Sequence, residues 1–235
     1  MKTLIIIPAY NEALNIEKTV NDIRNNSKYD YLIVNDCSKD NTKEICLKNN
    51  YNFISLPVNY GLASGIQIGM KYALQNNYDI AIQFDGDGQH NAKYLKELVK
   101  CIEDEKQDIA IGSRFASEKK PFSLRMIGSR VIELFIKIAT GKKIKDPTSG
   151  MRAYGKKAIV DLAKNSSLTP EPDTMVYFLK KGMNIKEVQV EMSEREYGES
   201  YLNIWKSIEY MINIIFSIIF IRAFTKKEKK NVNNT

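Results

Sequence analysis

The chain has 235 residues, of which 43% are hydrophobic, and its 35 basic and 28 acidic side chains give a net charge of +7. This length suits one α/β domain with a C-terminal addition, and the hydrophobic fraction excludes global disorder. The basic residues are spread along the chain except for a lysine cluster at 226–230. No nucleic-acid-binding motif accompanies them, so nucleic acid is not an expected partner. The cluster is either a solvated tail or a contact for anionic lipid.

The cysteines and the N-terminus both bear on the compartment. Cys37, Cys46 and Cys101 are scattered without metal-like spacing, which predicts free thiols in a reducing compartment. The apolar run at 4–7 is too short for a signal peptide. We therefore expect a cytoplasmic protein.

Strand-like and helix-like segments alternate along the first half of the chain. The apolar run from Lys2 to Pro8 predicts a strand buried on both faces of a parallel sheet. Further strands are expected at 31–34, 53–56, 80–84 and 108–112, with helices between them. In the first of these helices, one face would be formed by Ala13, Ile16, Val20 and Ile23. This order predicts a doubly wound α/β fold whose functional residues stand at the carboxyl ends of the strands.

A glycine repeat opens the third expected helix. Gly61, Gly65 and Gly69 recur at four-residue spacing, which predicts a flat helix face that packs closely on the sheet or on a ligand. The lysine of a phosphate-binding loop is missing, and no dinucleotide fingerprint follows the first strand. Hydride transfer is therefore not the expected chemistry.

The segment 81–90, AIQFDGDGQH, is the densest candidate site. In an extended chain Asp85, Asp87 and Gln89 project to one side, and such oxygen ligands suit Mg²⁺ or Mn²⁺. A polar turn without a ligand is the alternative reading. His90 follows directly and is expected to be a structural or helix-start residue rather than a catalytic base.

Two other polar segments follow strands in the same way: PAYNE at 8–12 and NDCSKD at 35–40. Together with the acidic motif they occupy three topologically equivalent places, which turn chemistry alone does not explain. We therefore expect them to form one site.

The second half of the chain is less regular. After Ser113, Arg114 and Phe115 comes an apolar stretch at 131–139, expected to be core or lipid-facing, and then a polar loop, DPTSGMRAY, at 146–154. A strand is expected at 187–192, followed by a polar segment at 193–201. The apolar stretch at 208–224 is too interrupted for a confident membrane span and predicts a helix lying in the membrane interface. Packing on the domain or a dimer contact is the alternative.

These motifs, in their order and spacing, resemble family 2 glycosyltransferases, in the branch of dolichol-phosphate mannosyltransferase and bacterial polyprenol-phosphate sugar transferases. The resemblance covers roughly residues 3–201 and implies a GT-A domain at 1–201. A C-terminal apolar helix at 202–225 and a basic tail at 226–235 would follow. It also implies a nucleotide-diphosphate sugar as donor, with Mg²⁺ or Mn²⁺ bridging its diphosphate.

The resemblance also implies roles for individual residues. Nucleotide-sugar binding would fall to Pro8, Ala9, Tyr10, Glu12, Asp36, Asp85 and Gly86, with Asn35 standing where many relatives have a first aspartate. The metal would be held by Asp85, Asp87 and Gln89, and the catalytic residues would be Asp87, Arg114 and Arg130. The acceptor side would be formed by Asp146, Thr148, Ser149 and Arg195. For each arginine the alternative is a surface ion pair.

The implied reaction is inverting transfer of a sugar from a GDP- or UDP-linked donor to a polyprenyl phosphate at the cytoplasmic face of the membrane. A phosphate acceptor is already anionic, whereas a sugar hydroxyl on a lipid-linked or cell-surface polysaccharide, the alternative acceptor, requires a carboxylate base. Two rivals are a catalytically silent nucleotide-sugar-binding protein and a sugar-1-phosphate nucleotidyltransferase. The latter would carry a glycine-rich loop and a lysine where PAYNE stands. A homodimer or a membrane partner subunit stays open.

Overall fold

A computed structural model describes residues 1–193 and 209–221, except for the side chains of residues 124 and 125. Arg195 and the lysine cluster at 226–230 therefore lie outside the described residues.

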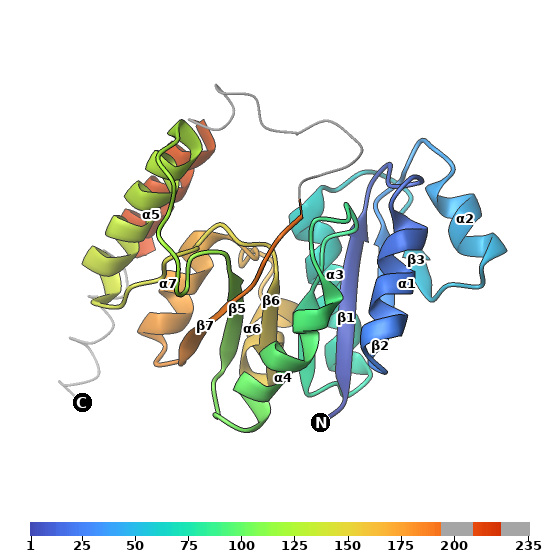
Figure 1. Cartoon of the computed structure of the whole chain (residues 1–235), viewed down its shortest axis with the longest axis horizontal. Helices are drawn as coiled ribbons and strands as arrows, with labels where there is room; N and C mark the ends of the chain where they lie inside the picture. Colours follow the sequence, from blue (N-terminus) through green and yellow to red (C-terminus); the bar gives the residue numbers. More distant parts are fainter. Residues whose placement is uncertain (194–208, 222–235) are drawn as a thin grey trace.

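The described chain is built around a seven-stranded sheet (Figure 1). In spatial order the strands are β3 (Phe53–Ser55), β2 (Asp30–Asn35), β1 (Thr3–Ala9), β4 (Ile80–Gln83), β6 (Arg152–Gly155), β5 (Ile109–Ser113) and β7 (Ile185–Gln189). Only β6 runs antiparallel to its neighbours, β4 and β5, and the other pairs are parallel. The predicted doubly wound, mostly parallel α/β fold is confirmed.

Helices connect the strands and cover both faces of the sheet. Their bounds are α1 (Ile16–Asn26), α2 (Thr42–Lys48), α3 (Leu62–Gln75), the 3₁₀ turn η1 (Ala92–Tyr94), α4 (Leu95–Glu103), α5 (Leu124–Thr140), α6 (Lys156–Lys164) and α7 (Pro172–Lys180). Residues 209–221 are also helical. The predicted inner face of α1 is confirmed for Ile16, Val20 and Ile23, which are all buried. The prediction was wrong for Ala13, which precedes the helix and is half-buried.

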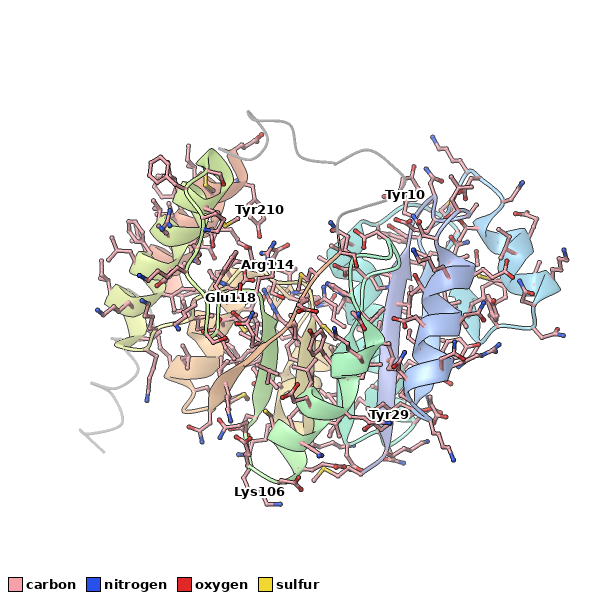
Figure 2. The ribbon with its side chains drawn as sticks, viewed as in Figure 1. Tyr10, Tyr29, Lys106, Arg114, Glu118 and Tyr210 are labelled. Atoms are coloured by element: carbon pink, nitrogen blue, oxygen red, sulfur yellow. The ribbon has the colours of Figure 1, made fainter. Side chains whose placement is uncertain are left out.

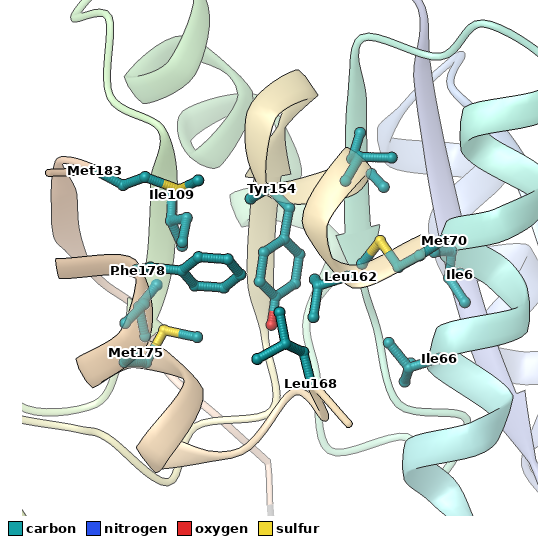
Figure 3. Packing of buried hydrophobic residues seen from close by; sticks show 14 of the residues in the cluster. Ile6, Ile66, Met70, Ile109, Tyr154, Leu162, Leu168, Met175, Phe178 and Met183 are labelled. Carbon is teal, nitrogen blue, oxygen red and sulfur yellow. The ribbon is translucent and has the colours of Figure 1, made fainter. Parts of the chain in front are cut away.

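The core lies in two layers, one on each side of β1. All seven residues of this strand are buried, and alternate side chains point to opposite faces. Leu4 and Ile6 join one apolar cluster with residues of α3, α6 and α7, part of which Figure 3 shows. Ile5 and Ile7 join the other cluster, with residues of α1 and α4. Burial of each such side chain stabilises the fold by about 1.5–3 kcal/mol.

The glycine face of α3 packs on β1 as the sequence predicts. A β-carbon built on Gly69 would lie 2.3 Å from Cγ2 of Ile6, whereas one on Gly65 would make ordinary contacts with Pro8 and Val34, at 3.6 Å and 3.9 Å. Gly61 precedes the helix with φ of 84°, a conformation that favours glycine. Close helix–strand approach, not ligand contact, thus explains Gly69.

The expected loop at 146–154 is partly wrong, because Arg152–Gly155 forms strand β6. Its inward side chains include Arg152 and Tyr154, both fully buried. A buried arginine hides the apolar alternation that normally indicates a strand. Strand β7 also begins two residues before the expected start, at Ile185.

Helix α5 and the helix at 209–221 lie side by side at one end of the molecule (Figure 1). They approach so closely that a β-carbon on Gly128 of α5 would stand 2.0 Å from Sδ of Met211. Ile132, Ile136, Ile214 and Ile218 are buried, so the expected apolar stretches do contribute to the core. Among the described residues, no helix is both long and apolar enough to cross a bilayer.

Candidate functional site

The segments after β1 and β2 are bound together by side chains capping backbone groups. Thr42 Oγ1 accepts from the backbone N of Glu12 at 2.9 Å, and the Asp40 carboxylate accepts from the backbone N of Ala13 at 3.0 Å. The Ser38 hydroxyl accepts from the backbone N of Asn11, also at 3.0 Å. The PAYNE and NDCSKD segments therefore form one connected surface, as expected for strands that end at the same edge.

Asp36 shapes the next loop instead of standing free at the surface. Its buried carboxylate accepts from the backbone N of Tyr60 at 2.8 Å and from that of Gly61 at 2.7 Å. These bonds fix the entry to α3. The role of Asp36 in nucleotide-sugar binding stays a prediction, and both of its carboxylate oxygens already accept hydrogen bonds from this loop.

The other predicted nucleotide-binding residues lie where β1 and β4 end. Pro8 and Ala9 pair with Val34 and Asn35 of β2, and the half-buried Tyr10 stands at the same edge as Arg114 (Figure 2). Gly86 packs against β1: a β-carbon here would lie 3.0 Å from the carbonyl oxygen of Pro8.

Glu12 connects this edge to the start of α1. Its carboxylate accepts from the Asn15 side-chain amide at 2.8 Å, and its carbonyl oxygen accepts from the backbone N of Ile16 at 2.8 Å. A β-carbon on Gly86 would lie 3.7 Å from Cγ of Glu12. The PAYNE segment and the acidic motif are therefore in contact.

The backbone of Asp85 is fixed by a hydrogen bond, whereas its carboxylate can still accept further bonds. Its backbone N–H donates to Nδ1 of His90 at 2.9 Å, so His90 has the structural role expected for it. Within the described part of the chain the nearest donors to the carboxylate are Gln83 Nε2 at 3.4 Å and His90 Nε2 at 3.6 Å. Both distances are at or beyond the usual limit for a hydrogen bond, and 27% of the side chain is exposed.

The donor set of this motif fits a hard divalent cation. The buried Asp87 accepts from the backbone N of Gln89 at 3.1 Å, which makes a tight turn at Gly88, whose φ is 75°. Two carboxylates and an amide suit Mg²⁺ or Mn²⁺ when water or phosphate completes the coordination. Among the described residues no three histidine, cysteine or acidic side chains converge on a metal site.

On the other side of the site Arg114 and Asp146 form a two-pronged ion pair. Nε and Nη2 of Arg114 donate to the two oxygens of Asp146, each at 2.8 Å, and the backbone N of Arg114 donates to the same carboxylate at 3.1 Å. Asp146 is fully buried, and 24% of the Arg114 side chain is exposed. Arg114 therefore has a structural partner, and its catalytic role stays a prediction.

The predicted acceptor-side loop is fixed onto β5. The hydroxyl of Ser149 donates to the carbonyl of Gly112 at 2.5 Å, and that of Thr148 approaches the carboxylate of Asp146 at 3.4 Å. The backbone N–H groups of Lys145 and Asp146 both donate to Glu187 of β7, at 2.7 Å. This loop is thus rigidly connected to two strands.

Arg130 fastens the segment that leads into α5. Its Nη2 donates to the carbonyls of Lys120 and Pro121, at 2.7 Å and 3.3 Å. Lys120 in turn donates to Ser129 and Glu133 of α5, at 3.0 Å and 2.8 Å. The proposed catalytic role of Arg130 stays a prediction, and its observed contacts hold this segment on α5.

A buried polar cluster next to this loop was not predicted. Arg152 is fully buried and donates to the carbonyls of Pro147 and Pro170, at 2.8 Å each. Glu171, just before α7, accepts from the hydroxyl of Tyr210, and burial raises the pKa of Glu171. The segment Glu171-Pro172-Asp173 has proline in the first turn of a helix, a pattern that indicates the start of α7 next to this cluster.

Comparison with known proteins gives the family. The sequence profile described as Glycosyl transferase family 2 matches residues 4–162. The chain is 27% identical to a UDP-N-acetylglucosamine–dolichyl-phosphate N-acetylglucosaminyltransferase of Methanococcus voltae, covering 83% of this chain and 86% of that protein. It is 29% identical to an undecaprenyl-phosphate mannosyltransferase of Micrococcus luteus, covering 86% and 88%.

Solved structures support the same fold. The chain superposes with a TM-score of 0.66 and 14% identity on glucosyl-3-phosphoglycerate synthase from Mycobacterium tuberculosis in complex with Mn²⁺, UDP-glucose and phosphoglyceric acid, over 94% of this chain and 79% of that one. This likeness identifies the GT-A fold. With the profile match over more than half of its length, the chain belongs to glycosyltransferase family 2.

Proposed function

We propose that this glycosyltransferase moves a sugar, with inversion, from a UDP- or GDP-linked donor to a polyprenyl phosphate. The observation that carries the acceptor class is the similarity over more than four-fifths of both chains to enzymes named for transfer to dolichyl and undecaprenyl phosphate. A phosphate acceptor is itself the nucleophile at neutral pH, so the site needs no carboxylate base.

The donor is proposed to bind where β1, β2 and β4 end. Tyr10 and Glu12 would face the nucleoside, and Asp85, Asp87 and Gln89 would hold Mg²⁺ or Mn²⁺ against the diphosphate. The ion would neutralise charge on the departing nucleoside diphosphate. Chemistry of the donor set supports this assignment, since carboxylate and amide oxygens are what these ions prefer.

The enzyme is proposed to work at the inner face of the membrane, held there by α5 and the helix at 209–221. Their outward side chains include Phe122, just before α5, at 88% exposed, and Phe216 at 67%. Other exposed apolar side chains of the pair are Ile127, Leu134, Ile138, Ile212, Ile219 and Phe220. Residues 117–145 also carry eight basic and two acidic side chains, which suits anionic lipid.

The reaction is tested by supplying labelled UDP- and GDP-sugars with polyprenyl phosphate, in Mn²⁺, Mg²⁺ or EDTA. Metal-dependent label in an acid-labile lipid is the expected result and would name the donor. Asp104→Asn, an exposed carboxylate after α4, serves as a control that should keep activity. Metal-dependent donor hydrolysis without lipid product would instead favour the alternative acceptor, a hydroxyl of a lipid-linked or cell-surface polysaccharide.

The membrane contact has its own test. Phe122→Ser with Phe216→Ser should weaken sedimentation with phosphatidylglycerol vesicles several-fold, because each phenylalanine loses burial in the lipid interface. Leu47→Ser, which changes an apolar side chain of α2 that is 56% exposed, is the matched control and should bind normally. Equal binding of all three proteins would assign the two helices to packing or to a homodimer.

A further inference from the structure

Gly150 lies directly against the carboxylate of Asp85, from a part of the chain 65 residues away in sequence. A β-carbon built on Gly150 would stand 2.4 Å from Oδ2 of Asp85, 3.2 Å from its Cγ and 3.4 Å from its Oδ1. Real β-carbons essentially never come closer than 3.0 Å to another heavy atom. The three nearest atoms all belong to Asp85, so this one side chain sets the constraint.

The conformation of Gly150 does not itself require glycine. Its φ is not among the positive values, which occur at Gly61, Gly88, Gly141 and Gly182. An alanine is therefore compatible with the backbone at position 150. The space taken by the Asp85 carboxylate is the reason for glycine.

If a larger residue stood at 150, Asp85 would move and the loop would not. The residue before Gly150 is fixed by the bond from Ser149 Oγ to the carbonyl of Gly112 at 2.5 Å, and the residue after it by the carbonyl of Met151, which accepts from the backbone N of Gly112 at 2.8 Å. Among residues 1–193 and 209–221, the carboxylate of Asp85 has only the long contacts to Gln83 and His90 given above. A carboxylate can also swing about its side-chain torsions more easily than a backbone can shift.

We propose that Gly150 is a positioning residue that sets the direction of the Asp85 carboxylate and thereby the geometry of the metal and nucleotide site. This inference rests on the proposed function for the identity of the ligand. The loop that carries Gly150 also carries Asp146, the partner of Arg114. Gly150 thus provides a contact between the loop predicted to form the acceptor side and the motif predicted to bind the donor.

The first measurement is binding of UDP and GDP by calorimetry, each with Mn²⁺. Gly150→Ala should lose about tenfold or more in affinity in the presence of Mn²⁺, as is usual when a group that orients a metal ligand is changed. Gly65→Ala, whose new β-carbon makes only ordinary contacts, is the matched control and should bind like wild type. Wild-type affinity in Gly150→Ala would overturn the proposal.

The second measurement is thermal unfolding of a double-mutant set, which needs no ligand. Gly150→Ala should lower the unfolding midpoint in the natural background but not in an Asp85→Ala background, because all three crowding atoms are then gone. An equal decrease in both backgrounds would overturn the contact. If wild type binds neither nucleotide, the donor assignment fails, while the unfolding set still decides whether Gly150 and Asp85 are coupled.

Discussion

The pair of Arg114 and Asp146 gives the sharpest stability prediction. In Arg114→Ala the fully buried carboxylate of Asp146 loses two charge-assisted hydrogen bonds of 2.8 Å. What remains among the described contacts is the backbone N–H of residue 114 at 3.1 Å and the hydroxyl of Thr148 at 3.4 Å. The variant therefore leaves a buried charge only partly satisfied.

The expected loss of unfolding free energy follows from the burial of this ion pair. Removing one partner of a fully buried pair typically costs about 3–5 kcal/mol. Because the side chain of Arg114 is 24% exposed, water reaches the vacated space and we expect a loss just below that range, about 2–3 kcal/mol. For a chain of this size that corresponds to a decrease of roughly 4–12 °C in the midpoint of thermal unfolding.

Urea unfolding followed by circular dichroism measures this loss. Arg114→Lys keeps the charge but cannot donate two parallel bonds, so it should fall between wild type and Arg114→Ala. The double variant Arg114→Ala with Asp146→Ala should lose less than the sum of the two single changes. A loss below about 1 kcal/mol for Arg114→Ala, the size seen for exposed ion pairs, would refute the assignment of this pair as a structural element.

Three further predictions concern other described residues. Asp87→Ala should abolish sugar transfer, because it removes a proposed metal ligand, and should lower stability by at least about 1 kcal/mol, since the hydrogen bond to the turn at Gly88 is lost. A transfer assay beside an unfolding curve decides, and normal metal-dependent activity would contradict the site. Burial raises the pKa of the Cys46 thiol to about 11. Iodoacetamide at pH 8 should therefore label the partly exposed Cys37 well before Cys46, which mass spectrometry can follow. Equal labelling rates would argue against the buried position of Cys46. Burial pushes the pKa of Glu133 upward, but its lysine partners outweigh burial and hold the pKa below its ordinary value of 4.5. The difference in unfolding free energy between wild type and Lys120→Met should therefore persist above pH 4.5 and shrink as the pH falls below it. A difference that is independent of pH would contradict the ion pair.

The strands, and the sheet edge that bears the site, could be predicted because buried parallel strands appear in the sequence as continuous apolar runs. β1 is the clearest case, since every residue from Thr3 to Ala9 is buried. The polar segments that follow such runs reach the same edge whatever their partners are. Topology therefore explains why PAYNE, NDCSKD and the acidic motif were expected together before any contact was known.

The side-chain pairings were not predictable, because they join residues that local patterns do not connect. Arg114 and Asp146 are 32 positions apart, and Tyr210 and Glu171 are 39 apart. β6 escaped prediction for a related reason: the hydrogen bonds that allow Arg152 to be buried come from prolyl carbonyls in two loops. The periodicity of apolar residues indicates which apolar side chains are buried, but it does not indicate which polar side chains are buried.

The charges at the site indicate why a cation would matter for donor binding as well as for chemistry. A nucleoside diphosphate is an anion, and the acidic motif presents to it the carboxylate side chains of Asp85 and Asp87. Arg114, which was predicted to be a catalytic residue, already forms an ion pair with Asp146. In this arrangement the diphosphate would meet a region of like charge, which costs binding energy. A divalent ion between the carboxylates and the diphosphate would turn this repulsion into attraction. We therefore expect UDP or GDP to bind much more weakly in EDTA than in Mn²⁺. An affinity that is independent of the metal would contradict this electrostatic account.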